Sequence, residues 1–259
     1  MTQPEYNQAF GELVEIMTRL RAPNGCPWDR AQTHASLRGS FLDECYEVIE
    51  ALDEGDTGKL REELGDLLLH IVFQAQIATE NGEFDLAQVI RGISRKLRRR
   101  HPHVFGDAEA TDAAAVELNW EQIKKAERDP QTSALASVPQ ALPALNYSES
   151  IQGRAARLGF DWDDDNGVIE KLAEEIDEMR RAADETEWAA EFGDLLFTLV
   201  NIARRRGVNA ESALRGTNRK FYRRFGYMER VCFERGLELE GMSLTEMDAL
   251  WDEAKRELG

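Results

Sequence analysis

The sequence is poor in cysteine, proline and glycine, and it has no long apolar run. Its three cysteines, Cys26, Cys45 and Cys232, make no even set and no CxxC spacing, which argues against a disulfide scaffold or a zinc ribbon. Only 7 prolines and 19 glycines occur among 259 residues, which suits long helices better than disorder. No stretch approaches the roughly 18 apolar residues of a membrane span, and the N-terminus has no basic segment before an apolar run. We therefore expect a cytoplasmic protein that does not bind membranes.

Positive charge is also scarce. The chain has 49 acidic and 32 basic residues, a formal net charge of -17. General binding to nucleic-acid backbones is therefore not expected, because it needs a positive field that displaces counterions. A small polyphosphate remains compatible, if a metal on clustered carboxylates and a few cations meet its charge locally.

Apolar residues recur at spacings of three and four, which is typical of amphipathic helices. The spacing predicts helices over residues 5–21, 41–52, 60–81 and 84–100, with loops at 26–29 and 101–112. Three prolines, Pro130, Pro139 and Pro143, lie among small and polar residues, which indicates a linker. We predict an all-α protein with helical units at 1–128 and 146–259, joined by a linker at 129–145.

An internal repeat is the most informative feature of the chain. Short blocks from the first half return in the same order in the second half. The matched blocks are Glu44-x-x-Glu47 with Glu175-x-x-Glu178, Glu63-Leu-Gly-Asp66-Leu-Leu with Glu191-Phe-Gly-Asp194-Leu-Leu, Arg91-Gly-x-x-Arg95-Lys96 with Arg215-Gly-x-x-Arg219-Lys220, Arg99-Arg100 with Arg223-Arg224, and Trp120-Glu-x-x-Lys124 with Trp251-Asp-x-x-Lys255. Two copies of one helical unit are therefore expected.

The repeated acidic pairs predict a metal site. Residues three apart share one helix face, and two helices joined by a short turn run antiparallel, so four carboxylates would face one another. An isolated ExxE motif usually lies on a solvent-exposed helix face. Because ExxE occurs together with ExxD in both halves, a metal site is favoured here. Oxygen ligands suit Mg²⁺ or Mn²⁺, and a missing His or Cys argues against zinc. We expect one side of the second acidic helix to be buried through Leu195, Leu196, Leu199 and Val200.

Basic and aromatic residues follow the acidic blocks. Lys220, Arg223 and Arg224 have the helical spacing that would let them bind a triphosphate, although a basic helix end also simply complements the helix dipole. Trp251 could stack on a base or belong to the core.

These blocks together resemble the MazG nucleoside triphosphate pyrophosphohydrolases over nearly the whole chain. The blocks that carry the resemblance are CPWD at 26–29, QTH at 32–34, DExxE and ELGDLL, RRHPHVFGD at 99–107, and the second-half EExxE, EFGDLL, NRKFYRRF and LW. The resemblance implies a homodimer of four-helix units that hydrolyses nucleoside triphosphates to monophosphates and pyrophosphate with Mg²⁺, or Mn²⁺ as the alternative.

The resemblance also implies roles for residues in the second copy. Glu174 or Glu175 would take the proton of the attacking water. The metal ligands would be Glu175, Glu178, Glu191 and Asp194, and the nucleotide contacts would be Lys171, Glu174, Lys220, Arg223, Arg224 and Trp251. A duplicate metal site at Glu44, Glu47, Glu63 and Asp66 is held in reserve, because Asp43 replaces a usual glutamate there. The second copy departs from the family at Glu187, where a lysine is frequent.

Other functions remain open at this point. The enzyme could clear nucleotides with broad base tolerance, or act on one non-standard or deoxynucleotide. Alternatively, a dimeric scaffold could sense a magnesium-bound nucleotide without turnover. A di-iron bundle is disfavoured, because neither half has the Glu-x-x-His pair of such sites.

Overall fold

The computed structural model describes residues 3–108 and 131–259, together with residues 112, 115–116, 119–120, 123, 127 and 129 between them. Every regular element in these ranges is a helix, which confirms the all-α prediction. The chain forms two compact units, Met1–Arg128 and Asp129–Gly259. No helix in the described ranges is long and apolar enough to cross a membrane. Lys124 of the predicted repeat and Pro130 of the predicted linker lie outside the described residues.

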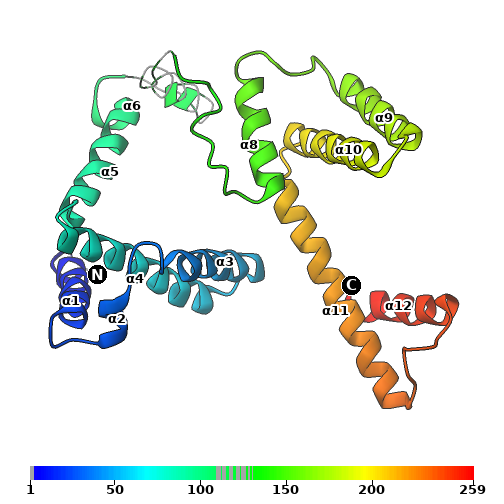
Figure 1. Cartoon of the computed structure of the whole chain (residues 1–259), viewed down its shortest axis with the longest axis horizontal. Helices are drawn as coiled ribbons and strands as arrows, with labels where there is room; N and C mark the ends of the chain where they lie inside the picture. The colour runs from blue at the N-terminus through cyan, green and yellow to red at the C-terminus, as the bar shows by residue number, and fades with distance from the viewer. Residues whose placement is uncertain are drawn as a thin grey trace. The chain divides into compact units, whose positions relative to one another are not determined.

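The first unit is built around two long helices that lie side by side (Figure 1). Its helices are α1 (Gln3–Arg21), α2 (Pro27–Ala31), α3 (Arg38–Glu54), α4 (Thr57–Asn81), α5 (Leu86–Arg100) and α6 (Pro102–Phe105). Helix α3 packs along α4, and α1 packs against the other half of α4. The buried core there consists of Met17, Leu37, Val72, Phe73 and Ile77.

The two segments expected to be loops each contain a short helix. Pro27 begins α2 and Pro102 begins α6. Proline suits the first helical position, because its φ is already helical and its missing N–H has no partner there in any case. The loop prediction was wrong at these residues because the apolar period of so short a helix is too brief to detect.

Aspartate caps fix the turns that bring the acidic helices together. Gly55 ends α3 with a left-handed φ of 69°, a conformation that glycine adopts without steric cost. The Asp56 carboxylate then accepts hydrogen bonds from the N–H groups of Gly58 and Lys59 at 2.8 and 3.0 Å. Asp184 caps the corresponding helix of the second unit in the same way. Each turn is short, so each acidic pair of helices runs antiparallel.

The second unit repeats this arrangement. Its helices are α8 (Ala144–Ala156), α9 (Asp165–Arg181), α10 (Glu185–Arg205), α11 (Ala210–Arg235) and α12 (Leu244–Leu258). Helix α11 is longer than α5, the helix that carries the matching basic block in the first unit. Helices α9 and α10 pair as α3 and α4 do, α8 packs on α10, and α12 packs on α11 (Figure 1). A second core cluster of Met228, Val231, Cys232 and Leu250 joins α11 to α12.

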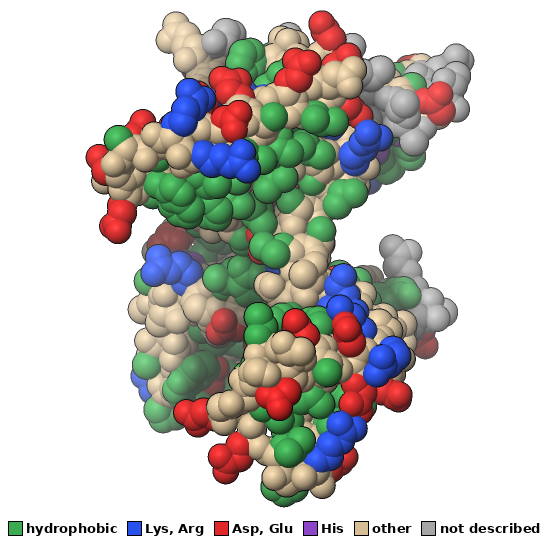
Figure 2. Space-filling model, turned by 90° about the vertical axis from the view of Figure 1, so that its right-hand side faces the viewer, with side chains coloured by type: hydrophobic (Ala, Val, Ile, Leu, Met, Phe, Trp, Pro, Cys, Tyr) green, Lys and Arg blue, Asp and Glu red, His purple; other side chains and the backbone are tan. Residues whose placement is uncertain are grey.

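Hydrophobic side chains remain exposed on α10, contrary to the sequence prediction. Leu196 and Leu199 are 39% and 44% exposed, whereas Val200 is buried together with the polar Thr198 and Asn201. Helices α8 and α9 cover one side of α10, and its other side faces solvent in the single chain. Figure 2 shows hydrophobic side chains gathered into a continuous patch on part of the surface that it draws, with charged side chains around it.

Arg21 holds the CPWD segment against the rest of the first unit. Its side chain is 7% exposed and lies 2.7 Å from the Glu80 carboxylate. It also donates hydrogen bonds to the carbonyl oxygens of Asp29 and Gln32 and lies 5.4 Å from the Phe73 ring centre. The hydrogen bonds from Arg21 hold the pKa of Glu80 below its usual value.

We predict that R21A destabilises the first unit by about 2–4 kcal/mol, because it leaves a carboxylate and two carbonyls without their charged donor. Urea unfolding followed by hydrogen exchange in α4 measures this effect. R19A is the matched control, since Arg19 is exposed on the same helix, and it should have little effect. Equal losses in the two variants would refute the role given to Arg21.

Candidate metal centre

Three carboxylates of the second unit converge between α9 and α10. Oxygen atoms of Glu175, Glu178 and Glu191 all lie within 4.8 Å of one another. Glu175 and Glu178 stand one turn apart on α9, and Glu191 faces them from α10. Asp194 lies one turn beyond Glu191 on α10, outside this close triplet. Three of the four predicted metal ligands are therefore brought together, with the fourth next to them.

Repulsion among these groups affects the pKa of Glu191. The pKa of Glu191 is raised above its usual value, first by burial and then by the charges of Glu178, Asp194 and Glu175. A cluster of this kind is stabilised by a cation. Its donors are all carboxylate oxygens, the ligand type that Mg²⁺ and Mn²⁺ prefer.

Lys171 provides one such cation from within the chain. Its ammonium nitrogen lies 3.1 Å from Glu174, 2.9 Å from Glu175 and 3.9 Å from Glu178. Hydrogen bonds to Glu175 and Glu174 raise the pKa of Lys171, so it stays charged at neutral pH. Glu175 is almost fully buried and Glu174 is exposed, so the two candidate bases differ in their access to water.

The first unit contains a matching cluster. Oxygen atoms of Glu44, Glu63 and Asp66 lie within 4.8 Å of one another. Burial raises the pKa of Glu63, and a hydrogen bond between the carboxyl groups of Glu47 and Glu63 raises it further. Burial, followed by the charge of Asp66, also raises the pKa of Glu44. All four predicted residues of the duplicate site thus interact.

The sequence interpretation missed one residue at this first cluster. His70 Nε2 lies 3.8 Å from Glu44 Oε1. His70 follows Asp66 by four positions on α4, so the helical period was the signal that could have placed it on the same face.

Of the predicted nucleotide contacts, Lys171 and Glu174 lie beside the carboxylates on α9. The others, Lys220, Arg223, Arg224 and Trp251, lie on α11 and α12. The Arg224 guanidinium lies 5.7 Å from the Trp251 ring centre, and Phe221 packs 5.2 Å from the same ring. Lys220 and Arg223 are exposed. Within the described part of the chain, no hydrogen bond or ion pair joins these residues to Glu175, Glu178 or Glu191.

The corresponding arginines of the first unit are engaged by a carboxylate. Glu127 lies 2.7 Å from Arg99 and 2.5 Å from Arg100, and the hydrogen bonds from Arg100 and then Arg99 lower its pKa to about 2. Arg100 also stacks on Trp120, as Arg224 does on Trp251. The two copies thus share an arginine–tryptophan pair, but the first copy neutralises its arginines internally.

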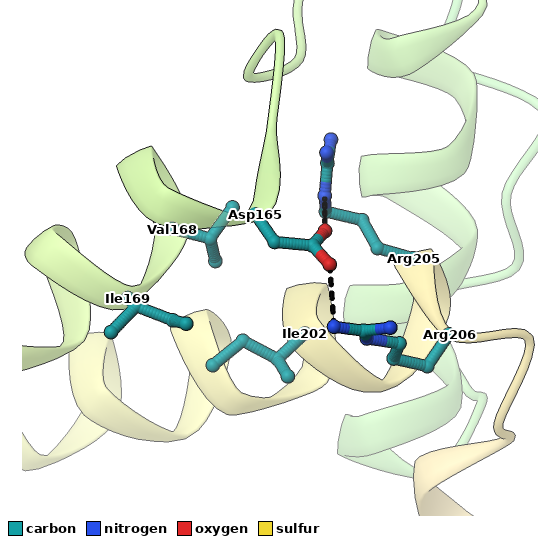
Figure 3. Close-up of a pocket in the computed structure, with 6 residues that line it drawn as sticks. All are labelled: Asp165, Val168, Ile169, Ile202, Arg205 and Arg206. Atoms are coloured by element: carbon teal, nitrogen blue, oxygen red, sulfur yellow. Dashed lines mark hydrogen bonds and ion pairs between the residues drawn. The ribbon is translucent and has the colours of Figure 1, made fainter.

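A small pocket at the other end of α9 and α10 has a structural role (Figure 3). It is lined by Asp165, Val168, Ile169, Ile202, Arg205 and Arg206. Asp165 pairs with Arg205 at 3.1 Å and with Arg206 at 2.6 Å, which ties the start of α9 to the end of α10. The charged groups that line the pocket are paired with one another, and these ion pairs hold α9 and α10 in alignment.

One protein-family model matches a segment of each of the two units. The model of the MazG nucleotide pyrophosphohydrolase domain matches residues 32–105 and 165–227. The chain is similar to the nucleoside triphosphate pyrophosphohydrolase/pyrophosphatase MazG of Thermotoga maritima, with 47% identity over 95% of each chain. It is also similar to the nucleoside triphosphate pyrophosphohydrolase of Escherichia coli K12, with 47% identity over 95% of this chain and 96% of the relative.

The crowding of the carboxylates predicts how the stability of the second unit depends on pH. Glu191 has a raised pKa when folded, so its contribution to stability is fully present below its ordinary value of 4.5 and is lost as pH rises through the folded pKa. We expect the metal-free protein to become more stable as pH falls from neutral through this window, and E191Q to flatten that profile.

Thermal unfolding of the metal-free chain at several pH values measures this dependence. E191Q should also reduce the stabilisation that Mg²⁺ gives the protein. E170Q is the control, because Glu170 is exposed on α9. An unchanged pH profile in E191Q would contradict the assignment of the repulsion to this cluster.

Proposed function

The chain belongs to the MazG family of nucleotide pyrophosphohydrolases, and we propose that its second unit hydrolyses nucleoside triphosphates with Mg²⁺ bound by Glu175, Glu178, Glu191 and Asp194. The products are a nucleoside monophosphate and pyrophosphate. The convergence of three carboxylates within 4.8 Å carries this proposal, and Mn²⁺ is the alternative ion. Broad base tolerance follows from the lack of a base-reading motif in the sequence.

In the proposed reaction, the oxygen of water attacks the α phosphorus and the bond from that phosphorus to the bridging oxygen breaks. The bound metal would orient the polyphosphate and stabilise the charge on the leaving pyrophosphate. A glutamate accepts the proton of the water. Lys171 contacts both glutamates, but Glu174 has the better access to solvent and Glu175 is buried.

Cations of the second unit are proposed to bind the phosphates. Lys220 and Arg223 are exposed and have no ion pair with any described residue, so a phosphate would not have to displace a carboxylate from them. Lys171 is proposed to exchange its carboxylate partners for phosphate oxygens. Trp251 supplies an aromatic face for the base, on the helix that packs against α11.

We propose that the active form is a homodimer. Leu196 and Leu199 are exposed on α10, beside the acidic face, and a second copy would remove such side chains from water. Lys220, Arg223 and Arg224 make no hydrogen bond or ion pair with the carboxylate cluster in the described single chain, which also supports a site completed by association. A cytoplasmic location is proposed from the cysteine usage alone.

The first test is the identity of the product. We expect incubation of nucleoside triphosphates with the protein and Mg²⁺ to release pyrophosphate and nucleoside monophosphate in equal amounts, and chelation of the metal to abolish both. Release of orthophosphate alone would refute the mechanism. Thermal stabilisation by nucleotide without any product would instead support a sensor.

The second test compares the two copies. We expect E178A to lower kcat/KM by more than about 100-fold, beyond the loss typical of groups that merely orient a metal ligand. E47A, the matched change in the first unit, should leave most of the activity, because the arginines of that unit are bound by Glu127. Equal losses would show that the first copy contributes equally to catalysis.

A further inference from the structure

The two carboxylate clusters differ in the basic group beside them. In the second unit Lys171 lies four residues before Glu175 and contacts it. The matching residue before Glu44 is Ser40, which has no charge. In the first unit the basic group is His70, four residues after Asp66, and Thr198 takes the matching place after Asp194. The first unit thus has an imidazole on α4 beside its cluster, where the second unit has an ammonium group on α9.

His70 is buried and its ring is not used by other polar groups. The residue is 8% exposed, and Nδ1 is buried without a hydrogen-bond partner. Nε2 lies 3.8 Å from Glu44 Oε1, which is too far for a hydrogen bond. The contact with Phe41 is an edge-on ring contact at 5.7 Å. A buried imidazole without hydrogen bonds is unfavourable by itself, and here it stands beside a carboxylate cluster.

The distances suit one ion shared by imidazole and carboxylates. Ligand atoms about 2.1 Å from an octahedral ion are about 3 Å apart when adjacent and about 4.2 Å apart when opposite. The separation of 3.8 Å between His70 Nε2 and Glu44 falls between these values. The oxygen atoms of Glu44, Glu63 and Asp66 lie within 4.8 Å of one another, and His70 Nε2 lies beside this set, next to Glu44. An ion bound by all four groups requires the imidazole to move closer to Glu63 and Asp66.

We propose that the first unit binds a divalent transition-metal ion through Glu44, Glu63, Asp66 and His70, and prefers it to Mg²⁺. Imidazole nitrogen favours ions such as Co²⁺ or Zn²⁺ over Mg²⁺, which takes oxygen ligands. The second unit has only oxygen donors in its cluster and keeps the preference for Mg²⁺. The two copies would thus hold different metals, whether or not the first copy takes part in hydrolysis.

The competing explanation is that His70 is a core residue that packs on Phe41. That role predicts a loss of stability when His70 is replaced, with equal effects on all metals. Ligation predicts a change in metal preference and a nitrogen bound to the ion. The readouts below separate these two roles.

The experiment uses the full chain with its second site removed by E175Q and E191Q, so that the first unit supplies the remaining cluster. Calorimetric titration with Co²⁺ and with Mg²⁺ measures the two affinities. We expect one Co²⁺ per chain, and we expect H70Q to weaken Co²⁺ binding by about tenfold or more while Mg²⁺ affinity changes little. H34Q is the matched control, since His34 also lies beside a glutamate, at 3.3 Å from Glu83, and it should leave both affinities unchanged.

Pulsed electron paramagnetic resonance of bound Mn²⁺ uses the chain without substitutions, so its result does not depend on whether a variant folds. The chain labelled with ¹⁵N-histidine should show a nitrogen coupling that shifts relative to the unlabelled chain. Absence of that coupling, absence of ion binding, or equal weakening of Co²⁺ and Mg²⁺ in H70Q would overturn the proposal. Assays of pyrophosphate release on the unchanged chain judge the proposed hydrolysis separately.

Discussion

Repulsion between carboxylates is the constraint around which each unit is organised. Antiparallel helices place three carboxylates within 4.8 Å in both copies, and burial together with neighbouring charges raises the pKa of Glu44, Glu63 and Glu191. Such a cluster is unfavourable unless a cation shares it. The aspartate caps and the short turns hold the helices in this arrangement, so the fold maintains a local repulsion that a metal ion can relieve. A fold optimised for stability alone would place apolar residues there.

The two copies differ in the groups that lie beside the carboxylates and in the basic residues that remain available to a phosphate. The second unit balances its cluster with Lys171 and leaves Lys220 and Arg223 exposed, whereas the first unit pairs Arg99 and Arg100 with Glu127. A phosphate-binding group must be available to substrate, so the internal pairing argues for a structural first unit. The imidazole of His70 adds a donor of another type to that unit.

The sequence predicted the helical class and the family, because both follow from local periodicity and from ordered motifs. Helical spacing also placed Glu175 with Glu178, and the short turn placed Glu191 opposite them. Burial was harder to predict: Leu196 and Leu199 look like core residues by period, yet their exposure depends on which neighbouring helices cover α10. His70 was missed because a single histidine gives no pattern, although its spacing from Asp66 was visible. The predicted domain boundary and the roles of the site residues stay predictions.

The strong negative charge of the chain restricts the form in which a nucleotide can approach it. A protein with net charge -17 repels a free triphosphate at long range, and salt screens that field only beyond about 8–10 Å. A divalent ion cancels about two charges of the nucleotide and is itself attracted by the carboxylate cluster, so the metal-bound nucleotide is the favoured species. In the proposed function, Lys220 and Arg223 would then act at short range, where contact geometry outweighs the overall field. The acidity that argues against nucleic-acid binding is therefore consistent with a metal–nucleotide substrate.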